Sequence, residues 1–215
     1  MSSPSSTGTC TLCGKSFNRS AMSRHLKTCT LAPPAKPNSP AFHLFIDARH
    51  DKSYWLHVAI PMESPLRLLD AFLRGIWLEC CGHLSAFTIA GELYECETEA
   101  GRKGMQVRLN RVLQPGLSFS YEYDYGSTTR LNLKIVDVWE RGTTKNSVEL
   151  LARNDAPQTV CQLCGERPAA EICTECAWND AGYLCETCAE EHDCGNNTWL
   201  PVVNSPRAGI CGYTG

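Results

Sequence analysis

Residues 161–194 read CQLCGERPAAEICTECAWNDAGYLCETCAEEHDC and contain three Cys-x2-Cys pairs, eight residues apart, followed by a His-x-Cys pair. Cysteine thiolates and histidine are the ligands that structural zinc prefers, and eight of them suit two closed tetrahedral sites with no position for a catalytic water. The stretch therefore predicts a small module that folds around two structural zinc ions. Its candidate ligands are Cys161, Cys164, Cys173, Cys176, Cys185, Cys188, His192 and Cys194.

The pairing of these ligands has more than one solution. The spacing resembles cross-brace modules such as the B-box, most closely over residues 183–192, where a Cys-x2-Cys knuckle leads into a short helix that carries a histidine. This resemblance implies that the first and third pairs hold one zinc ion, and that the second pair holds the other with His192 and Cys194. Sequential pairing is the alternative, and Cys211 can displace either of the last two ligands. The internal Cys-x-His-x2-Cys segment of RING domains is missing, which argues against a ubiquitin ligase.

The chain has 14 cysteines among 215 residues, far more than an ordinary globular protein carries. Its first residues lack the charged start and apolar run of a secretory signal, and no apolar stretch approaches the roughly 20 residues that span a membrane. We expect a cytoplasmic protein whose reduced Cys-x2-Cys pairs bind metal rather than form disulfides. Cys80 and Cys81 are not part of such a pair, and we interpret them as packing residues at a helix end.

A second zinc motif lies near the N-terminus and has the form Cys-x2-Cys-x11-His-x3-Cys. It resembles the ββα zinc finger with a cysteine in place of the second histidine, and Phe17 and Met22 are expected to form its small core. Metal binding would supply most of its folding free energy. Its candidate ligands are Cys10, Cys13, His25 and Cys29. Together the two motifs predict about three zinc ions per chain.

Charge is distributed unevenly along the chain. Residues 1–40 contain five Lys or Arg and no acidic residue, residues 41–156 carry a formal charge of −2, and residues 157–215 carry −6. The finger is a candidate for salt-sensitive phosphate contacts, although a single finger reads only about three base pairs. A solvated basic surface that docks on protein is the alternative. The acidic module should repel nucleic acid, so we expect it to bind protein or to serve structure alone. The candidate nucleic-acid contacts are Lys15, Arg19, Arg24 and Lys27.

Four segments are predicted: a zinc finger over residues 1–30, a proline-rich linker over 31–41, an α+β domain over 42–153, and a double-zinc module with a packed tail over 154–215. Four prolines in the linker favour an extended, semi-rigid spacer. The finger is therefore expected to be tethered to the central domain rather than fused with it.

The central domain shows the pattern of an α+β fold. Alternating apolar residues predict strands at 42–48 and 54–60 that form a hairpin. Ser64 and Pro65 are then expected to start a helix that runs to about Cys81. Further strands are expected at 84–89, 92–96, 105–113, 117–125 and 130–139. This order predicts a roll- or grasp-like sheet with one main helix, flanked by the two zinc-binding modules.

Two stretches of this domain, LLDAFLRGIWLECCGHLSAF at 68–87 and FSYEYDYG at 119–126, resemble the plasmid pRiA4b ORF-3-like family. The resemblance covers roughly residues 41–150 and implies a small α+β domain of no established activity, often encoded on plasmids or beside insertion elements. The family's motif continues with an acid, a tryptophan and a histidine, but this chain has Ser127, Thr129 and Leu131 there. A role that depends on that histidine is not carried over.

No catalytic residues are predicted, because no spacing among Asp124, His83, His57 and His43 places a nucleophile or a general base beside an orienting partner. We expect a non-enzymatic accessory or adaptor protein of a mobile element or defence system. It would contact protein through the central and C-terminal modules and nucleic acid through the finger. One alternative is a nucleic-acid-processing enzyme or subunit, marked by a pocket that gathers Asp47, Asp124 and histidines. The other is a purely structural protein.

Overall fold

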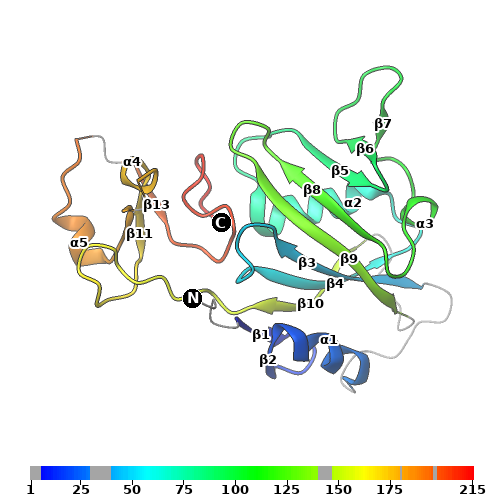
Figure 1. Ribbon diagram of the computed structural model, residues 1–215, viewed down its shortest axis with the longest axis horizontal. Helices are drawn as coiled ribbons and strands as arrows, with labels where there is room; N and C mark the ends of the chain where they lie inside the picture. The colour runs from blue at the N-terminus through cyan, green and yellow to red at the C-terminus, as the bar shows by residue number, and fades with distance from the viewer. Residues whose placement is uncertain (1–5, 30–39, 140–146, 180, 196–197) are drawn as a thin grey trace. The chain divides into compact units, whose positions relative to one another are not determined.

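The structure, a computed structural model, describes residues 6–29, 40–139, 147–179, 181–195 and 198–215. The predicted linker over 31–41 lies almost entirely outside the described residues. The chain forms two compact units, Met1–Gly75 with His83–Asp155 and Ile76–Gly82 with Ala156–Gly215. The fold mixes helix and sheet, with mostly sheet and few helices (Figure 1). None of the helices in the described ranges is both long and apolar enough to cross a membrane.

The first unit is built on a ten-stranded sheet in the order β2-β1-β10-β4-β3-β9-β8-β5-β6-β7 (Figure 1). Its strands are β1 (Thr7–Cys10), β2 (Ser16–Asn18), β3 (Ala41–Ala48), β4 (Trp55–Pro61), β5 (Ser85–Ile89), β6 (Glu92–Glu95), β7 (Lys103–Gly104), β8 (Ser118–Tyr123), β9 (Thr129–Trp139) and β10 (Glu149–Asn154). Its helices are α1 (Arg19–Thr28), α2 (Leu66–Leu73) and α3 (Leu109–Val112). The chain continues from α2 into a π-helical stretch, Arg74–Leu78.

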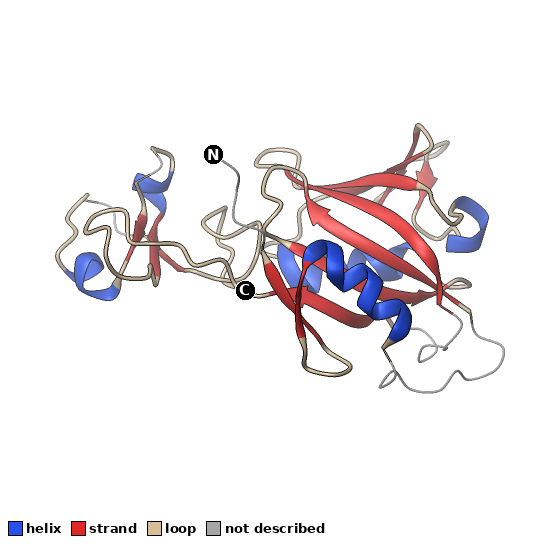
Figure 2. Ribbon diagram, turned by 60° about the horizontal axis from the view of Figure 1, so that its bottom comes forward, coloured by secondary structure: helices blue, strands red, loops and turns tan. Residues whose placement is uncertain are grey.

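Helices cover both faces of the central strands, which is why every residue of β4 is buried. On one face, the Asp70 carboxylate of α2 accepts a hydrogen bond from the Tyr121 hydroxyl of β8 at 2.8 Å. On the other face, Met22 and Leu26 of α1 share a hydrophobic cluster with Trp55 of β4. Figure 2 shows α1 lying across the strands on this second face. The core of the unit is therefore apolar on both sides of the sheet.

The predicted zinc finger belongs to the first unit and shares this sheet, so the expectation of a merely tethered finger is wrong. Its elements β1, β2 and α1 have the predicted ββα order, and β1 pairs antiparallel with β10. Gly8 allows the close approach: a Cβ atom there would collide with the carbonyl oxygen of Arg153 and the indole of Trp55. The hydroxyls of Thr7 and Thr9 also donate to the Asp155 carboxylate, at 2.8 and 2.9 Å.

The predicted hairpin of residues 42–48 and 54–60 is present, since β3 and β4 pair antiparallel over their whole length. The helix expected to run from Pro65 to about Cys81 is shorter. Its α-helical part ends at Leu73, and its N-cap is Pro65 without a side-chain hydrogen bond.

The strand predicted over 105–113 is absent, and the segment holds only the short helix α3. Its carbonyl groups instead serve the start of α2: Val107 O accepts from Leu66 N at 2.9 Å, and Met105 O accepts from Arg67 N at 2.8 Å. The first N–H groups of a helix have no partner within the helix. The carbonyl groups of Met105 and Val107 therefore bond to the start of α2 and not to a neighbouring strand.

The second unit contains a three-stranded sheet in the order β12-β11-β13. Its elements are β11 (Glu171–Cys173), α4 (Thr174–Ala177), β12 (Tyr183–Leu184), α5 (Glu186–Glu190) and β13 (Trp199–Pro201). These elements are too short to bury a large apolar core, and one of the unit's buried clusters consists of three cysteines and Leu184. In the tail, Ser205, Arg207 and Tyr213 are buried.

Candidate metal centres

Four groups of Cys and His can each hold a metal ion. Within each group, one ligand atom per residue lies within 4.8 Å of the corresponding atoms of the others. The groups are Cys10, Cys13, His25 and Cys29; Cys161, Cys164, Cys185 and Cys188; Cys173, Cys176, His192 and Cys194; and Cys80, Cys81, His83 and Cys211. The first three bring together all twelve ligands predicted from the sequence, and the fourth was not expected.

The finger group joins a turn to a helix. Cys10 and Cys13 flank a turn closed by a hydrogen bond from Gly14 N to Cys10 O at 2.8 Å, where Gly14 takes a left-handed φ of 71°. From α1, the Nε2 atom of His25 lies 3.3 Å from the Cys13 Sγ atom. The Phe17 ring stacks on the imidazole of His25 at 4.2 Å between centroids and so holds its orientation. Thiol and imidazole ligands on one tetrahedral zinc ion would lie about 3.6 Å apart.

The two knuckle thiols of the finger differ in acidity. Burial raises the pKa of the Cys10 thiol to about 11, whereas the backbone N–H of Lys15 lowers the pKa of the Cys13 thiol. Metal binding must therefore displace a proton that Cys10 otherwise keeps. The metal affinity of such a site falls as the pH falls.

The group around Cys161 lies in the second unit, where α5 follows the third knuckle. Burial acts to raise the pKa of the Cys161 thiol, but backbone N–H groups, with that of Cys164 first, bring it down to about 6. Burial and neighbouring thiols raise the pKa of Cys188 to about 12. The Arg167 guanidinium lies beside these sulfurs, and its hydrogen bond to Cys164 raises its own pKa. This cation compensates the negative charge that four thiolates leave around a divalent ion.

The group around Cys173 is formed by β11, α4 and the segment after α5. The Sγ atoms of Cys173 and Cys194 lie 3.2 Å apart, and Cys176 Sγ lies 3.4 Å from His192 Nε2. The Trp199 ring contacts the imidazole of His192 edge-on, at 5.5 Å between centroids. The two groups of this unit interleave along the chain, as cross-brace pairing requires and sequential pairing does not.

Cys211 belongs to neither group of the predicted module. It lies with Cys80, Cys81 and His83, although the first two were interpreted as packing residues. Their signal in the sequence is a Cys-Cys-x-His run, which lacks the Cys-x2-Cys spacing of a knuckle. The ligand Cys211 is 130 positions from Cys81, and no local pattern links the two.

The four basic residues of the finger differ in their surroundings. Arg19 Nη1 lies 3.3 Å from an oxygen of Asp47, and Lys27 Nζ lies 3.5 Å from an oxygen of Asp137. Lys15 and Arg24 are exposed. The predicted phosphate contacts thus divide into two cations that pair with the central domain and two that face solvent.

Asp47 and Asp124 of the central domain do not lie together. Asp47 accepts hydrogen bonds from Lys52 and Asn132, at 2.7 and 2.8 Å, whereas Asp124 lies 3.5 Å from His83 Nε2. The two aspartates therefore have different neighbours. The pocket of Asp47, Asp124 and histidines that would mark an enzyme does not appear among the contacts of the described residues.

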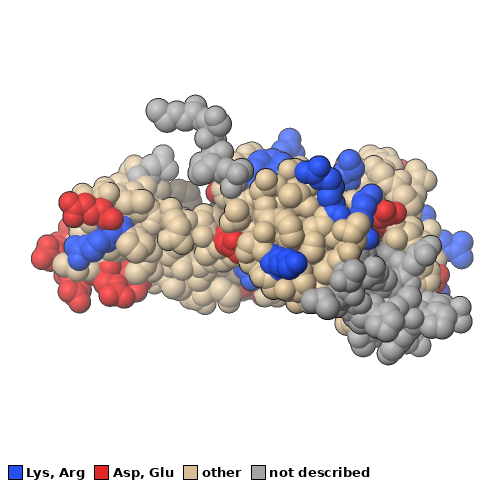
Figure 3. Space-filling model, turned by 90° about the horizontal axis from the view of Figure 1, so that it is seen from below, with Lys and Arg blue, Asp and Glu red and all other residues tan. Residues whose placement is uncertain are grey.

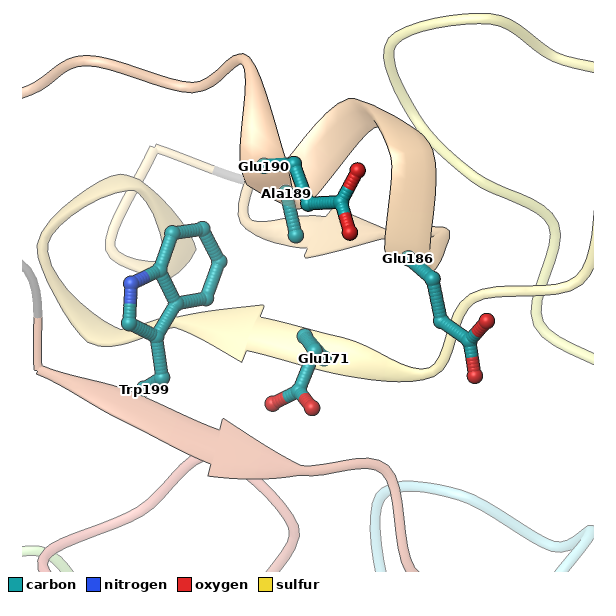
Figure 4. Close-up of a pocket in the computed structure, with 5 residues that line it drawn as sticks. All are labelled: Glu171, Glu186, Ala189, Glu190 and Trp199. Carbon is teal, nitrogen blue, oxygen red and sulfur yellow. The ribbon is translucent and has the colours of Figure 1, made fainter.

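The second unit also carries a shallow cavity of about 450 Å³ with an acidic lining. Glu171 of β11, Trp199 of β13, and Glu186 and Glu190 of α5 surround it (Figure 4). Figure 3 shows Asp and Glu side chains crowded on this unit, and Lys and Arg spread over the visible face of the first unit. The cavity offers three carboxylates and one indole ring to a partner.

Comparison with known proteins adds little. No family model matches the chain, and no curated protein matches it. Among the solved structures that match is a protein of unknown function from Methanosarcina mazei Go1, with a TM-score of 0.45 and 14% identity. That match covers 49% of this chain and 65% of the other. What stands for this chain is that four clusters of cysteine and histidine can bind metal ions.

Proposed function

We propose that the chain is a non-enzymatic zinc-binding accessory or adaptor protein. The observation that carries this proposal is that the finger group and both groups of the predicted module each offer four protein ligands. Four ligands complete the tetrahedron of zinc and leave no open position for water or substrate. Sets rich in thiolate favour zinc over magnesium or calcium. In this proposal about three zinc ions build shape and take no part in chemistry.

The acidic cavity of the second unit provides the protein contact of this adaptor. A Lys or Arg side chain of a partner can pair there with Glu186 or Glu190 and lie against the face of Trp199. The formal charge of −6 over residues 157–215 would also attract a basic partner over a longer range. We therefore assign the module a basic protein segment rather than nucleic acid.

The finger makes a smaller contribution in this proposal. Because Arg19 and Lys27 pair with acidic residues of the sheet, Lys15 and Arg24 are left as its phosphate contacts. A two-residue contact gives weak, salt-sensitive affinity without sequence preference.

The biological setting of this proposal rests on the resemblance of residues 68–87 and 119–126 to the plasmid pRiA4b ORF-3-like family. On that basis the central domain is a roll- or grasp-like member of the family, and the protein serves a mobile element or a defence system in the cytoplasm.

Metal content and peptide binding test the proposal together. Elemental analysis of the purified protein should give at least three zinc ions per chain, since three groups are closed. A fluorescein-labelled octalysine peptide should bind in an anisotropy titration, and Glu186→Gln with Glu190→Gln should weaken it roughly tenfold. The control is Glu166→Gln with Glu175→Gln, which removes the same charge from exposed positions outside the cavity. Fewer than two zinc ions, or equal loss in both double variants, would contradict the proposal.

A further inference from the structure

Three thiols meet in the second unit at a place that the predicted zinc ligands do not occupy. The Cys81 Sγ atom lies 3.7 Å from Cys80 Sγ and 3.6 Å from Cys211 Sγ. Cys80 and Cys81 follow the π-helical stretch, and Cys211 lies in the C-terminal tail.

The distances between these sulfur atoms match those of ligands that share one metal ion. Zinc–thiolate bonds of about 2.3 Å at tetrahedral angles place two sulfurs about 3.8 Å apart. No disulfide joins these three cysteines. The separations are similar to the 3.2 Å between Cys173 and Cys194 in a predicted zinc group.

A buried cation lies beside the thiols. The Arg207 side chain is fully buried, and its Nη2 atom donates to Cys80 Sγ at 3.5 Å. A guanidinium stays charged at all relevant pH values, and a buried charge is costly unless negative charge lies near it. Thiolates provide that charge, and a metal ion is what keeps thiols deprotonated at neutral pH. In the Cys161 group, Arg167 likewise lies beside the thiols.

Hydrogen bonds of Ser205 connect the C-terminal tail to the π-helical stretch. The Ser205 hydroxyl donates to the carbonyl of Trp77 at 2.6 Å, and it accepts from Arg207 N at 2.9 Å. Cys211 itself has a left-handed φ of 56°, which few residues other than glycine adopt. Such conformations persist where the surrounding structure imposes them, often at binding sites.

From these contacts we infer that Cys80, Cys81 and Cys211 of the second unit form a further zinc site. It lies outside the three groups of the proposed function and does not depend on them. The zinc ion joins the end of the π-helical stretch to the tail, two segments that the hydrogen bonds of Ser205 already connect.

Metal counting with single substitutions tests this site. Zinc is measured by elemental analysis on the full chain, purified under reducing conditions and dialysed against buffer without metal. The wild-type chain should hold about four zinc ions, Cys211→Ser about three, and Cys211→His about four again. Cys96→Ser is the matched control, because its thiol lies outside all four groups of the described residues, and it should keep four.

Each outcome decides the question. Equal zinc content in the wild-type chain and in Cys211→Ser overturns the site, whether that content is three or four. If Cys211→Ser loses more than one ion, restoration by Cys211→His supports the site and a persistent loss overturns it. A wild-type content below two contradicts the proposed function instead, and the difference between wild type and Cys211→Ser still decides this site.

Discussion

The Nε2 atom of His43 lies 3.0 Å from the Nδ1 atom of His57, and both rings are buried beneath the finger helix. Burial lowers the pKa of His43 to about 4, and burial together with the nearby His43 lowers that of His57 to about 3. The charges of Asp137 and Lys27 act on His43 in opposite directions. Both histidines are therefore neutral at pH 7, and protonation of either one would place a charge in the buried core.

This pair predicts a loss of stability in acid. The unfolded chain takes up protons near pH 6.5 that the folded chain refuses, so stability is full above pH 6.5 and falls as the pH drops towards about 4. Each histidine contributes up to about 1.4 kcal/mol per pH unit to that slope. In His43→Gln the slope of the urea midpoint between pH 4.5 and 6.5 should become clearly smaller. All zinc ligands remain in this variant, so acid release of metal affects both proteins alike; equal slopes would show that the pair is not the cause.

Gly8→Ala should weaken the junction between β1 and β10. The added methyl group meets the carbonyl of Arg153 and the ring of Trp55, and overpacking of this kind costs about 1–3 kcal/mol. Chemical unfolding measures the loss, and Ser16→Ala on exposed β2 should stay within about 0.5 kcal/mol of the wild type. If both variants unfold at the same denaturant concentration, the close approach of β1 is not as described.

Loss of a metal ligand of the finger should reduce the protection of the β10 amides from hydrogen exchange. Cys13→Ser removes one ligand of the finger group and leaves the other groups intact. The Asp155 amide donates to Thr7 O at 2.9 Å, so its protection depends on β1 staying in place. Hydrogen exchange over 149–155 should become at least roughly tenfold faster, which corresponds to about 1.4 kcal/mol. Exchange over 118–123 in β8 is the internal control; unchanged exchange over 149–155 would mean that β1 holds without zinc.

Nucleic-acid contact, if the finger makes it, depends on Lys15 and Arg24. Replacement of both by Gln should lower the affinity for a 20-base-pair DNA and reduce the slope of log K against log salt by about 2. Fluorescence anisotropy between about 50 and 200 mM salt covers the useful range. Arg19→Gln with Lys27→Gln is the matched control, because those two cations already pair with acidic residues. Equal salt slopes in both double variants would remove nucleic acid from the proposed function.

Local patterns in the sequence predicted the local parts of this structure. The alternation of apolar residues located β3 and β4, and the Cys and His spacings located three groups of facing ligands. Cross-brace grouping was one of two pairings left open, because spacing alone does not say which knuckles fold onto each other. The limits of α2 were less accurate, since the segment 105–113 supplies backbone partners from outside the helix.

Contacts between distant segments escaped prediction. Nothing near Cys81 in the sequence points to Cys211, and nothing in β1 points to β10. The four prolines of residues 31–41 suggested a finger that is tethered to the central domain. The Thr7 and Thr9 hydroxyls of β1 instead bond to Asp155, the Thr11 hydroxyl just after β1 bonds to Leu150, and Gly8 makes room for Trp55.

The partner strand of β1 is made last among the strands of the first sheet. Thr7 and Asp155, which close the junction, are 148 positions apart. During synthesis the finger has all its ligands once residue 29 has emerged, so it can capture metal while most of the sheet does not yet exist. Pairing between strands that are far apart in the sequence forms slowly, and a finger that is already folded leaves fewer conformations to be sampled before β1 pairs with β10. A finger that binds metal at this stage would present β1 as a preformed edge, to which β10 adds when the sheet is completed.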